Sequence, residues 1–126
     1  MQLSPLPELP GVSYVMPVLN EEDYLEEAVR TILAQDYAGE KEIVLALGPS
    51  SDRSDEIAAG LAASDARVRL VGNPRRDIPI GLNLAIAASR HPVIVRVDAH
   101  SELTPDYTRL GIESLRGTGA ADVGGV

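Results

Sequence analysis

The sequence contains no cysteine, and this absence excludes several kinds of chemistry. Thiol nucleophiles, disulfide bridges and zinc sites with cysteine ligands all need a sulfur atom that the chain does not have. Phenylalanine and tryptophan are absent too, so the four tyrosines are all the aromatic residues. The core of this protein must therefore consist of leucine, isoleucine, valine and alanine.

Positive charge is also scarce. Lys41 is the only lysine, and the formal net charge of the chain is −8. Proteins that bind nucleic acids usually present a basic face, so we expect no nucleic-acid partner. If the chain binds an anion such as a diphosphate, a divalent metal ion is the natural source of positive charge.

Long apolar runs are missing as well. No segment approaches the roughly 20 consecutive apolar residues of a membrane-spanning helix, so we expect no membrane segment. The N-terminal residues have neither the basic start nor the apolar stretch of a secretion signal. With 126 residues, of which 44% are hydrophobic, the chain can form a single domain with one core.

What the sequence does contain is a regular alternation of apolar strands and amphipathic helices. After a proline-rich, extended lead-in over residues 1–11, this pattern continues to residue 126 and stops as a fifth strand begins, so we expect a piece of a longer protein. Strict alternation with short connections predicts an α/β fold, a Rossmann-like parallel sheet with helices on both faces. The expected strands cover residues 12–18, 42–47, 67–71, 93–97 and 121–126, with helices around 25–33, 54–61, 80–89 and 105–115.

Polar residues mark the expected helix starts. Asn20 stands where the N-cap of the first helix belongs, and Ser51 or Ser54 can cap the second. Thr104 followed by Pro105 predicts the start of the last helix, because proline favours the first helical position.

The fourth strand, residues 93–97, ends in Asp98, Ala99 and His100. A carboxylate and an imidazole are both good ligands for ions such as Mn²⁺; the alternative is a helix-capping aspartate and a loop histidine. In an open parallel sheet, ligands bind beyond the carboxyl ends of the strands where the strand order reverses. If the strand order is 3-2-1-4, that point lies between the first and fourth strands, and residues 17–22 lie beside residues 98–100.

The turn after the first strand carries Glu21 and Glu22 instead of a glycine-rich phosphate loop. Two acids would repel phosphate and already satisfy the helix dipole, so dinucleotide binding of the dehydrogenase type is disfavoured. The turn suits a base or ribose, and the alternative is that both glutamates are ordinary first-turn acids.

Arg75 and Arg76 could reach a diphosphate, but we favour a solvated loop for this pair.

Together these motifs resemble glycosyltransferase family 2, the inverting enzymes of the GT-A fold, over residues 12–126. Within the family, the sequence is similar to the succinoglycan-type, exopolysaccharide branch through residues 97–101 and 119–125. The family resemblance rests on residues 15–22, the strand 42–47 with its Ser-Ser-Asp sequel, Asn73-Pro74, Gly81-Leu82-Asn83 and Asp98.

The resemblance implies a nucleotide-sugar donor site. Pro17, Leu19 and Glu21 would line the base and ribose pocket, and Asp98 and Ala99 would contact the ribose and diphosphate. The nucleotide-binding residues implied in this way are Pro17, Val18, Leu19, Glu21, Gly48, Asn83, Asp98 and Ala99.

The resemblance also implies a divalent cofactor, Mn²⁺ or Mg²⁺, held by Asp98 and His100. The family usually has Asp-x-Asp here, whereas Asp-x-His is similar to the metal site of polypeptide N-acetylgalactosaminyltransferases. The cation would neutralise charge on the departing diphosphate.

Two features of the family are missing. The second strand usually ends in Asp-Asp-Gly-Ser, whose acid contacts uracil, whereas residues 46–50 read Ala-Leu-Gly-Pro-Ser, so a backbone group near Gly48 would have to substitute. The family's general base follows the fifth strand, beyond Val126. We therefore expect the donor-binding part of an inverting transferase that uses a UDP-sugar and a glycan or lipid-linked acceptor. The family also implies a cytoplasmic location, at the cytosolic face of the membrane.

A noncatalytic α/β interaction domain is the second hypothesis. A phosphoacceptor receiver domain needs a lysine late in the chain, whereas Lys41 precedes the second strand. A nucleotidyltransferase brings a glycine-rich loop and a basic residue after its first strand, where this chain has acids. Metal-dependent nucleotide binding would distinguish the transferase from an interaction domain.

Overall fold

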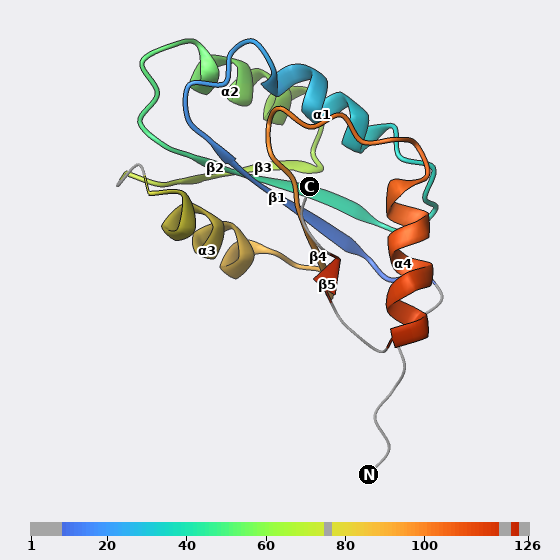
Figure 1. The fold of residues 1–126 in the computed structure, drawn as a ribbon. Helices are drawn as coiled ribbons and strands as arrows, with labels where there is room; N and C mark the ends of the chain where they lie inside the picture. The colour runs from blue at the N-terminus through green and yellow to red at the C-terminus, as the bar shows by residue number, and fades with distance from the viewer. Residues whose placement is uncertain (1–8, 75–76, 119–121, 124–126) are drawn as a thin grey trace.

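The computed structural model describes residues 9–74, 77–118 and 122–123, and strands alternate with helices along them (Figure 1). The expectations for residues 1–8, for Arg75 and Arg76, and for residues 119–121 and 124–126 fall outside the described part. The elements are β1 (Val12–Val18), α1 (Leu25–Leu33), β2 (Lys41–Leu47), α2 (Ser54–Ser64), β3 (Val68–Gly72), α3 (Ile78–Ala88), β4 (Val93–Arg96), α4 (Tyr107–Thr118) and β5 (Asp122–Val123).

The strands form one parallel sheet in the order β3-β2-β1-β4-β5. The chain begins in the middle of the sheet, proceeds to β3 at one edge, and then crosses back to place β4 on the other side of β1. The sheet therefore has the order 3-2-1-4 that the expected site requires, with the reversal between β1 and β4.

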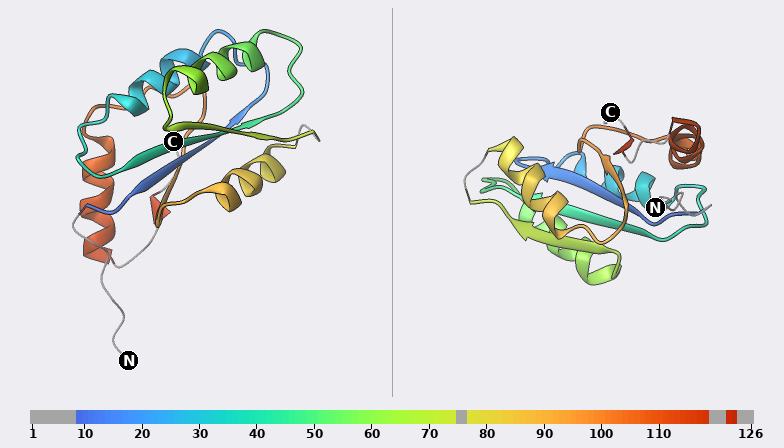
Figure 2. Two further views of the ribbon diagram at one scale, coloured as in Figure 1. Left: turned by 180° about the vertical axis from the view of Figure 1, so that it is seen from behind. Right: turned by 90° about the horizontal axis from the view of Figure 1, so that it is seen from below.

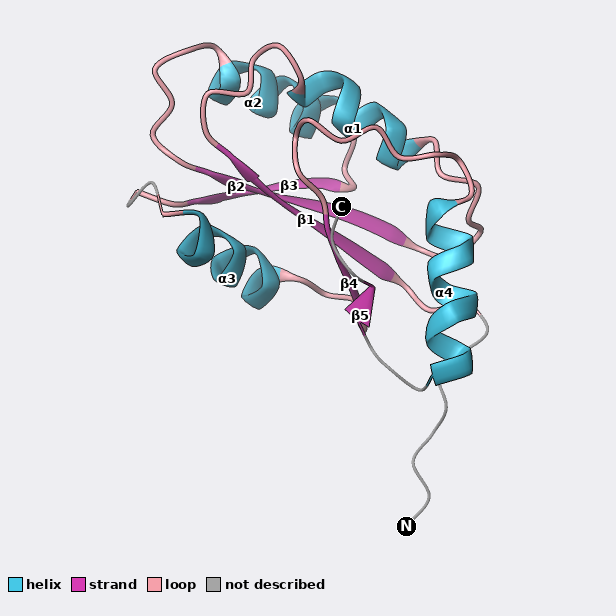
Figure 3. Ribbon diagram, viewed as in Figure 1, coloured by secondary structure: helices cyan, strands magenta, loops and turns pink. Residues whose placement is uncertain are grey.

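Helices cover both faces of the sheet, as predicted (Figures 1 and 3). Helices α1 and α2 lie together on one face, and α3 lies on the other. The two further views agree, and they place α4 at one end of the sheet rather than over its centre (Figure 2).

The core has two parts because the central strands are buried on both faces. Tyr14 and Met16 of β1 face the larger cluster, which α1, α2 and α4 complete, so the core is not purely aliphatic as expected. Val15 points the other way, into a small cluster with Val44 and Ala85 under α3. This two-sided burial is what the continuous apolar run of β2 predicts.

Both capping predictions for the first two helices are wrong, because the polar side chains bind a neighbouring loop instead. Helix α1 begins at Leu25, with Tyr24 at the N-cap. Asn20 adopts a left-handed backbone with φ 54°, and its side-chain oxygen accepts the N–H of Ser51 at 2.8 Å. At the start of α2, Asp52 accepts the N–H of Ser54 at 2.9 Å.

The later helices also begin at different residues from those predicted. Helix α4 starts at Tyr107 rather than Pro105, and the hydroxyl of Thr104 donates to Asp106 at 2.9 Å. Helix α3 starts at Ile78, where Asp77 accepts the N–H of Ile80. A local sequence signal therefore locates these helices to within about two residues, as is usual for helix ends.

A buried carboxylate holds the amino ends of the strands together. Glu42 accepts the hydroxyl of Ser13 at 2.6 Å, the backbone N–H of Arg90 at 2.6 Å and the guanidinium of Arg69 at 2.9 Å. Burial by itself would raise the pKa of Glu42, but these donors outweigh it and hold the pKa below its ordinary value. The carboxylate thus links β1, β2, β3 and the turn before β4.

The Glu42→Gln variant tests this link. At neutral pH we expect a loss of roughly 1.5–3 kcal/mol in the free energy of unfolding, because hydrogen bonds to a buried charged group disappear. A depressed pKa stabilises the fold above the ordinary value of 4.5 and loses that effect as the pH falls below it. Urea titrations at pH 7 and pH 3.5 should therefore show a smaller difference at the lower pH.

The matched control is Glu26→Gln, which removes an exposed acid from α1. That acid pairs with Arg30 at the surface, where such pairs contribute at most about 1 kcal/mol. Equal effects of the two substitutions at pH 7 would contradict a special role for Glu42.

Candidate functional site

The carboxyl ends of β1 and β4 enclose a cavity of about 440 Å³, which we call the strand-end cavity. This is where the reversal of strand order predicts a site. The loop after β1 and the loop after β4 therefore meet as expected. The lining residues are Pro17, Leu19, Glu21, Ile78, Arg96, Asp98 and His100.

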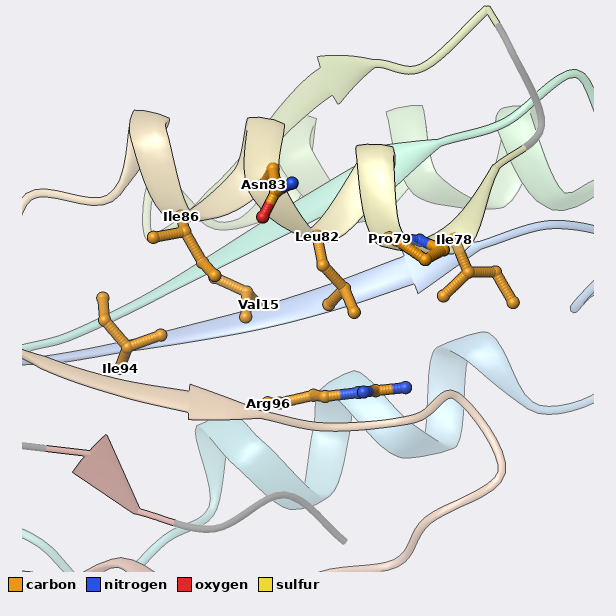
Figure 4. A pocket seen from close by; sticks show the side chains of 8 residues that line it. All are labelled: Val15, Ile78, Pro79, Leu82, Asn83, Ile86, Ile94 and Arg96. Carbon is orange, nitrogen blue, oxygen red and sulfur yellow. The ribbon is translucent and has the colours of Figure 1, made fainter.

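A second cavity of about 510 Å³ lies beside it, between α3 and the sheet (Figure 4). We call it the α3 groove; its walls are mostly apolar. Ile78 and Arg96 line both cavities, so the two are neighbours. The groove is lined by Val15, Ile78, Pro79, Leu82, Asn83, Ile86, Ile94 and Arg96.

The loop after β1 is fixed by the loop after β2. Three successive backbone N–H groups, those of residues 20–22, donate to side-chain oxygens of Ser50 at 2.9 Å, Ser54 at 2.6 Å and Asp52 at 3.1 Å. In a phosphate-binding turn such groups would point at the ligand. Here they are already used, which agrees with the prediction that this turn does not hold phosphate.

Glu21 and His100 meet inside the strand-end cavity. Nε2 of His100 lies 2.8 Å from Oε2 of Glu21, and the imidazole stacks on Tyr24 with ring centroids 4.2 Å apart. The Glu21 side chain is only 17% exposed. Its Oε2 atom has no hydrogen bond of regular geometry among the described residues. Burial raises the pKa of Glu21, and the nearby His100 opposes that effect.

Asp98 lies at the mouth of the cavity with 47% of its side chain exposed. Its backbone carbonyl accepts the N–H of Ser101 at 3.0 Å, which forms a tight turn after the strand. The alternative that Asp98 caps a helix is wrong, because the next helix begins at Tyr107. The carboxylate is therefore available to a ligand.

The residues of the cavity fit a divalent cation in part. Asp98 and His100 offer an oxygen and a nitrogen donor, a pair that suits Mn²⁺-like ions. Nε2 of His100, however, faces Glu21. Among the described residues, no three acidic or histidine side chains are grouped closely enough to hold an ion alone. Water and phosphate oxygens would have to supply the other ligands of a bound ion.

The remaining predicted residues lie around this cavity in different ways. Val18 is 1% exposed and Ala99 is 4% exposed, so both residues offer almost no surface to a ligand. A group that replaces the missing uracil-binding acid must accept a hydrogen bond. The carbonyl of Gly48 already accepts the N–H of Ser50 at 2.9 Å, and its N–H donates to the carbonyl of Val18 at 2.8 Å. Asn83 is exposed on α3 and lines the α3 groove rather than the strand-end cavity.

Sequence reasoning missed two residues that line the cavity, Ile78 and Arg96, and it also missed the contact of Tyr24 with His100. Tyr24 was not predicted to support His100, because the stacking joins two loops that are distant in the sequence. Arg96 was overlooked in favour of Arg75 and Arg76. The alternation of side chains along β4 places Arg96 on the same face as Asp98, and that signal could have found it.

Comparison with known proteins decides the family. The model for glycosyl transferase family 2 matches residues 13–126. The chain belongs to this family. The predicted family is therefore confirmed.

Among the relatives of this family 2 chain is succinoglycan biosynthesis protein ExoA of Rhizobium meliloti. The two are 32% identical over 111 residues, which cover 86% of the chain and 34% of ExoA. The chain thus spans about a third of the length of that relative.

Two solved structures share the fold of this family member. Mannosyltransferase PcManGT from Pyrobaculum calidifontis, in complex with GDP-Man and Mn²⁺, superimposes with a TM-score of 0.77 at 25% identity. S. aureus TarS 1–349 gives a TM-score of 0.74 at 16% identity. Each match covers 84% of this chain and 32% of the other. The α/β fold of the GT-A type is therefore confirmed.

In the described part, no helix has the length and apolar character needed to cross a membrane.

The buried carboxylate of Glu21 yields a stability test. A raised pKa means that the folded state holds the proton more tightly than the unfolded state, so the charged form costs stability above the ordinary value of 4.5. At pH 7, Glu21→Gln should therefore raise the free energy of unfolding by roughly 0.5–2 kcal/mol. The gain should shrink toward pH 4, as urea titrations at the two pH values can measure.

Glu102→Gln, which neutralises an exposed acid near the same loop, is the control and should change little at either pH. A Glu21→Gln variant that is less stable than the wild type at pH 7 would show that the contact with His100 outweighs the cost of burial.

Proposed function

We propose that this chain is the donor-binding part of an inverting glycosyltransferase. It would bind a nucleotide-diphosphate sugar, most simply a UDP-sugar, whose sugar is transferred to a polysaccharide or lipid-linked acceptor. The reaction would be assisted by a divalent metal ion and would take place at the cytosolic face of the membrane. The acceptor hydroxyl would be deprotonated by a general base that we assign to no residue of this chain.

The observation that carries the proposal is the meeting of two loops at the strand-order reversal of a family 2 chain. One cavity is lined by Pro17, Leu19 and Glu21, which are expected to face the base and ribose. The same cavity is lined by Asp98 and His100, which are expected to face the diphosphate. The complex of PcManGT with GDP-Man and Mn²⁺ supports a nucleotide sugar and a metal ion as ligands. The name of ExoA supports a role in exopolysaccharide synthesis.

Within the cavity, each group would have a separate task. Pro17 and Leu19 offer an apolar wall for the base, and the Glu21 carboxylate can accept hydrogen bonds from ribose hydroxyls. A divalent ion bound by Asp98 and His100 would supply charge neutralisation on the leaving diphosphate. Asn83, in the adjoining α3 groove, would lie toward the sugar end of the donor.

The base of the nucleotide is the least constrained part of the donor. The acid that contacts uracil in the family is absent, and both backbone groups of Gly48 have hydrogen-bond partners. UDP and GDP should accordingly be compared directly.

Isothermal titration calorimetry of this chain with UDP and GDP, each with Mn²⁺ and with EDTA, tests the proposal. We expect binding of UDP that strengthens at least about tenfold with Mn²⁺, because the ion offsets the repulsion between the diphosphate and Asp98. Stronger binding of GDP would correct the base while supporting the donor site. A folded chain that binds neither nucleotide would favour the interaction domain.

His100→Ala tests the metal assignment separately. We expect UDP affinity in Mn²⁺ to fall about tenfold or more, because one metal ligand is lost, while the melting temperature changes little for this 60%-exposed side chain. His91→Ala is the matched control, since His91 precedes β4 at the opposite end of the strand. If His100→Ala bound UDP with Mn²⁺ as tightly as the wild type, the metal assignment would be wrong.

A further inference from the structure

The two cavities share a cation to which the family resemblance gave no role. Arg96 is the last residue of β4 and lines both the strand-end cavity and the α3 groove. Among the described residues that line the two cavities, it is the one side chain with a permanent positive charge. Figure 4 shows its guanidinium extended along β4 toward the carboxyl end of the strand.

The guanidinium is also unusually free to bind a ligand. It makes no hydrogen bond with the described residues, and its nearest charged partner is Asp98, with Nη2 and Oδ1 3.9 Å apart. That separation is longer than a hydrogen bond. The side chain is 51% exposed, so its donors meet solvent in the open cavities. By contrast, the guanidinium of Arg69 donates hydrogen bonds to Glu42 and to the carbonyl of Ala88.

The charges around Arg96 indicate what it binds. Glu21 and Asp98 place two carboxyl groups in the same cavity, which would repel an anionic ligand. The backbone N–H groups of residues 20–22, the other local source of positive potential, are used by the β2–α2 loop. A diphosphate entering this cavity therefore needs a donor from the chain, and a guanidinium matches phosphate oxygens with two parallel hydrogen bonds.

We propose that Arg96 binds the diphosphate of the donor nucleotide directly and supplies the part of the affinity that does not require a metal ion. This inference rests on the proposed function, since it assumes a nucleotide diphosphate in the strand-end cavity. Arg96 lies between the two cavities, so it would lie near the junction of the diphosphate and the sugar. Arg96 is thus a binding residue that acts beside the metal ion rather than through it.

The test compares Arg96→Gln and Arg96→Lys with the wild type, by calorimetry in EDTA, with UDP and uridine as ligands. We expect Arg96→Gln to weaken UDP at least about tenfold, because two charge-assisted hydrogen bonds are lost. Uridine, which has no phosphate, should bind as before. The UDP affinity of Arg96→Lys should lie between those of the wild type and Arg96→Gln, because lysine keeps the charge but lacks the planar guanidinium group.

Inorganic pyrophosphate identifies the group that Arg96 holds. In the wild type it should compete with UDP, and in Arg96→Gln it should compete at least about tenfold less well. If pyrophosphate bound in an Arg96-dependent way but did not displace UDP, Arg96 would bind an anion other than the UDP diphosphate. That result would overturn the proposal. The control is Arg109→Gln, which removes a half-exposed arginine from α4 and should leave all these affinities unchanged.

The outcomes separate this inference from the proposed function. UDP binding that is indifferent to Arg96→Gln would overturn the role of Arg96 and leave the donor site standing. An equal loss for UDP and uridine would show that Arg96 shapes the cavity instead of binding phosphate. A wild-type chain, folded by circular dichroism, that binds neither UDP nor GDP would overturn both proposals.

Discussion

The parallel pairing of β1 with β2 on one side and β4 on the other is the constraint on which the rest of the structure depends. It sets Val15 beside Arg96 and Val18 beside Leu47 in the sheet. The loops that leave these three strands must then meet at one edge, although they are separated by dozens of residues in the chain. The cavity at that edge is a consequence of sheet topology, and its chemistry follows from the few polar residues placed there.

Two glutamates at opposite ends of the sheet show how the same side chain can serve different purposes. Glu42 is surrounded by donors that hold its pKa below the ordinary value, so its charge supports the fold. Most of the Glu21 side chain is covered, its Oε2 atom has no hydrogen bond of regular geometry among the described residues, and its pKa is raised. Proteins place poorly satisfied charged groups at sites that await a ligand, and they offset the cost elsewhere in the structure. The contrast supports the proposal that ligands bind at the carboxyl end of the sheet.

The elements were predictable from sequence because they depend on periodicity, which is local, whereas the order of the strands follows from the fold class and not from any single segment. Alternating strands and helices and the approach of residues 17–22 to Asp98 were both confirmed, and the strands have the order that this approach requires. The role of Asn20 was not predictable, because its side chain has two possible partners. A helix terminus nearby predicted a cap, whereas the loop 31 residues away provided Ser51. The pairing of Glu21 with His100 likewise depends on contacts between distant loops, which no single segment encodes.

Helix α3 presents apolar surface to solvent, because Ile78 and Ile86 are each nearly half exposed. Surfaces of this kind draw molecules together in concentrated solution. The formal net charge of −8 works against such association, because copies of the chain repel one another. Added salt screens that repulsion and leaves the apolar attraction intact. The colloidal behaviour of the chain is therefore a balance between one uncovered helix face and an excess of carboxylates.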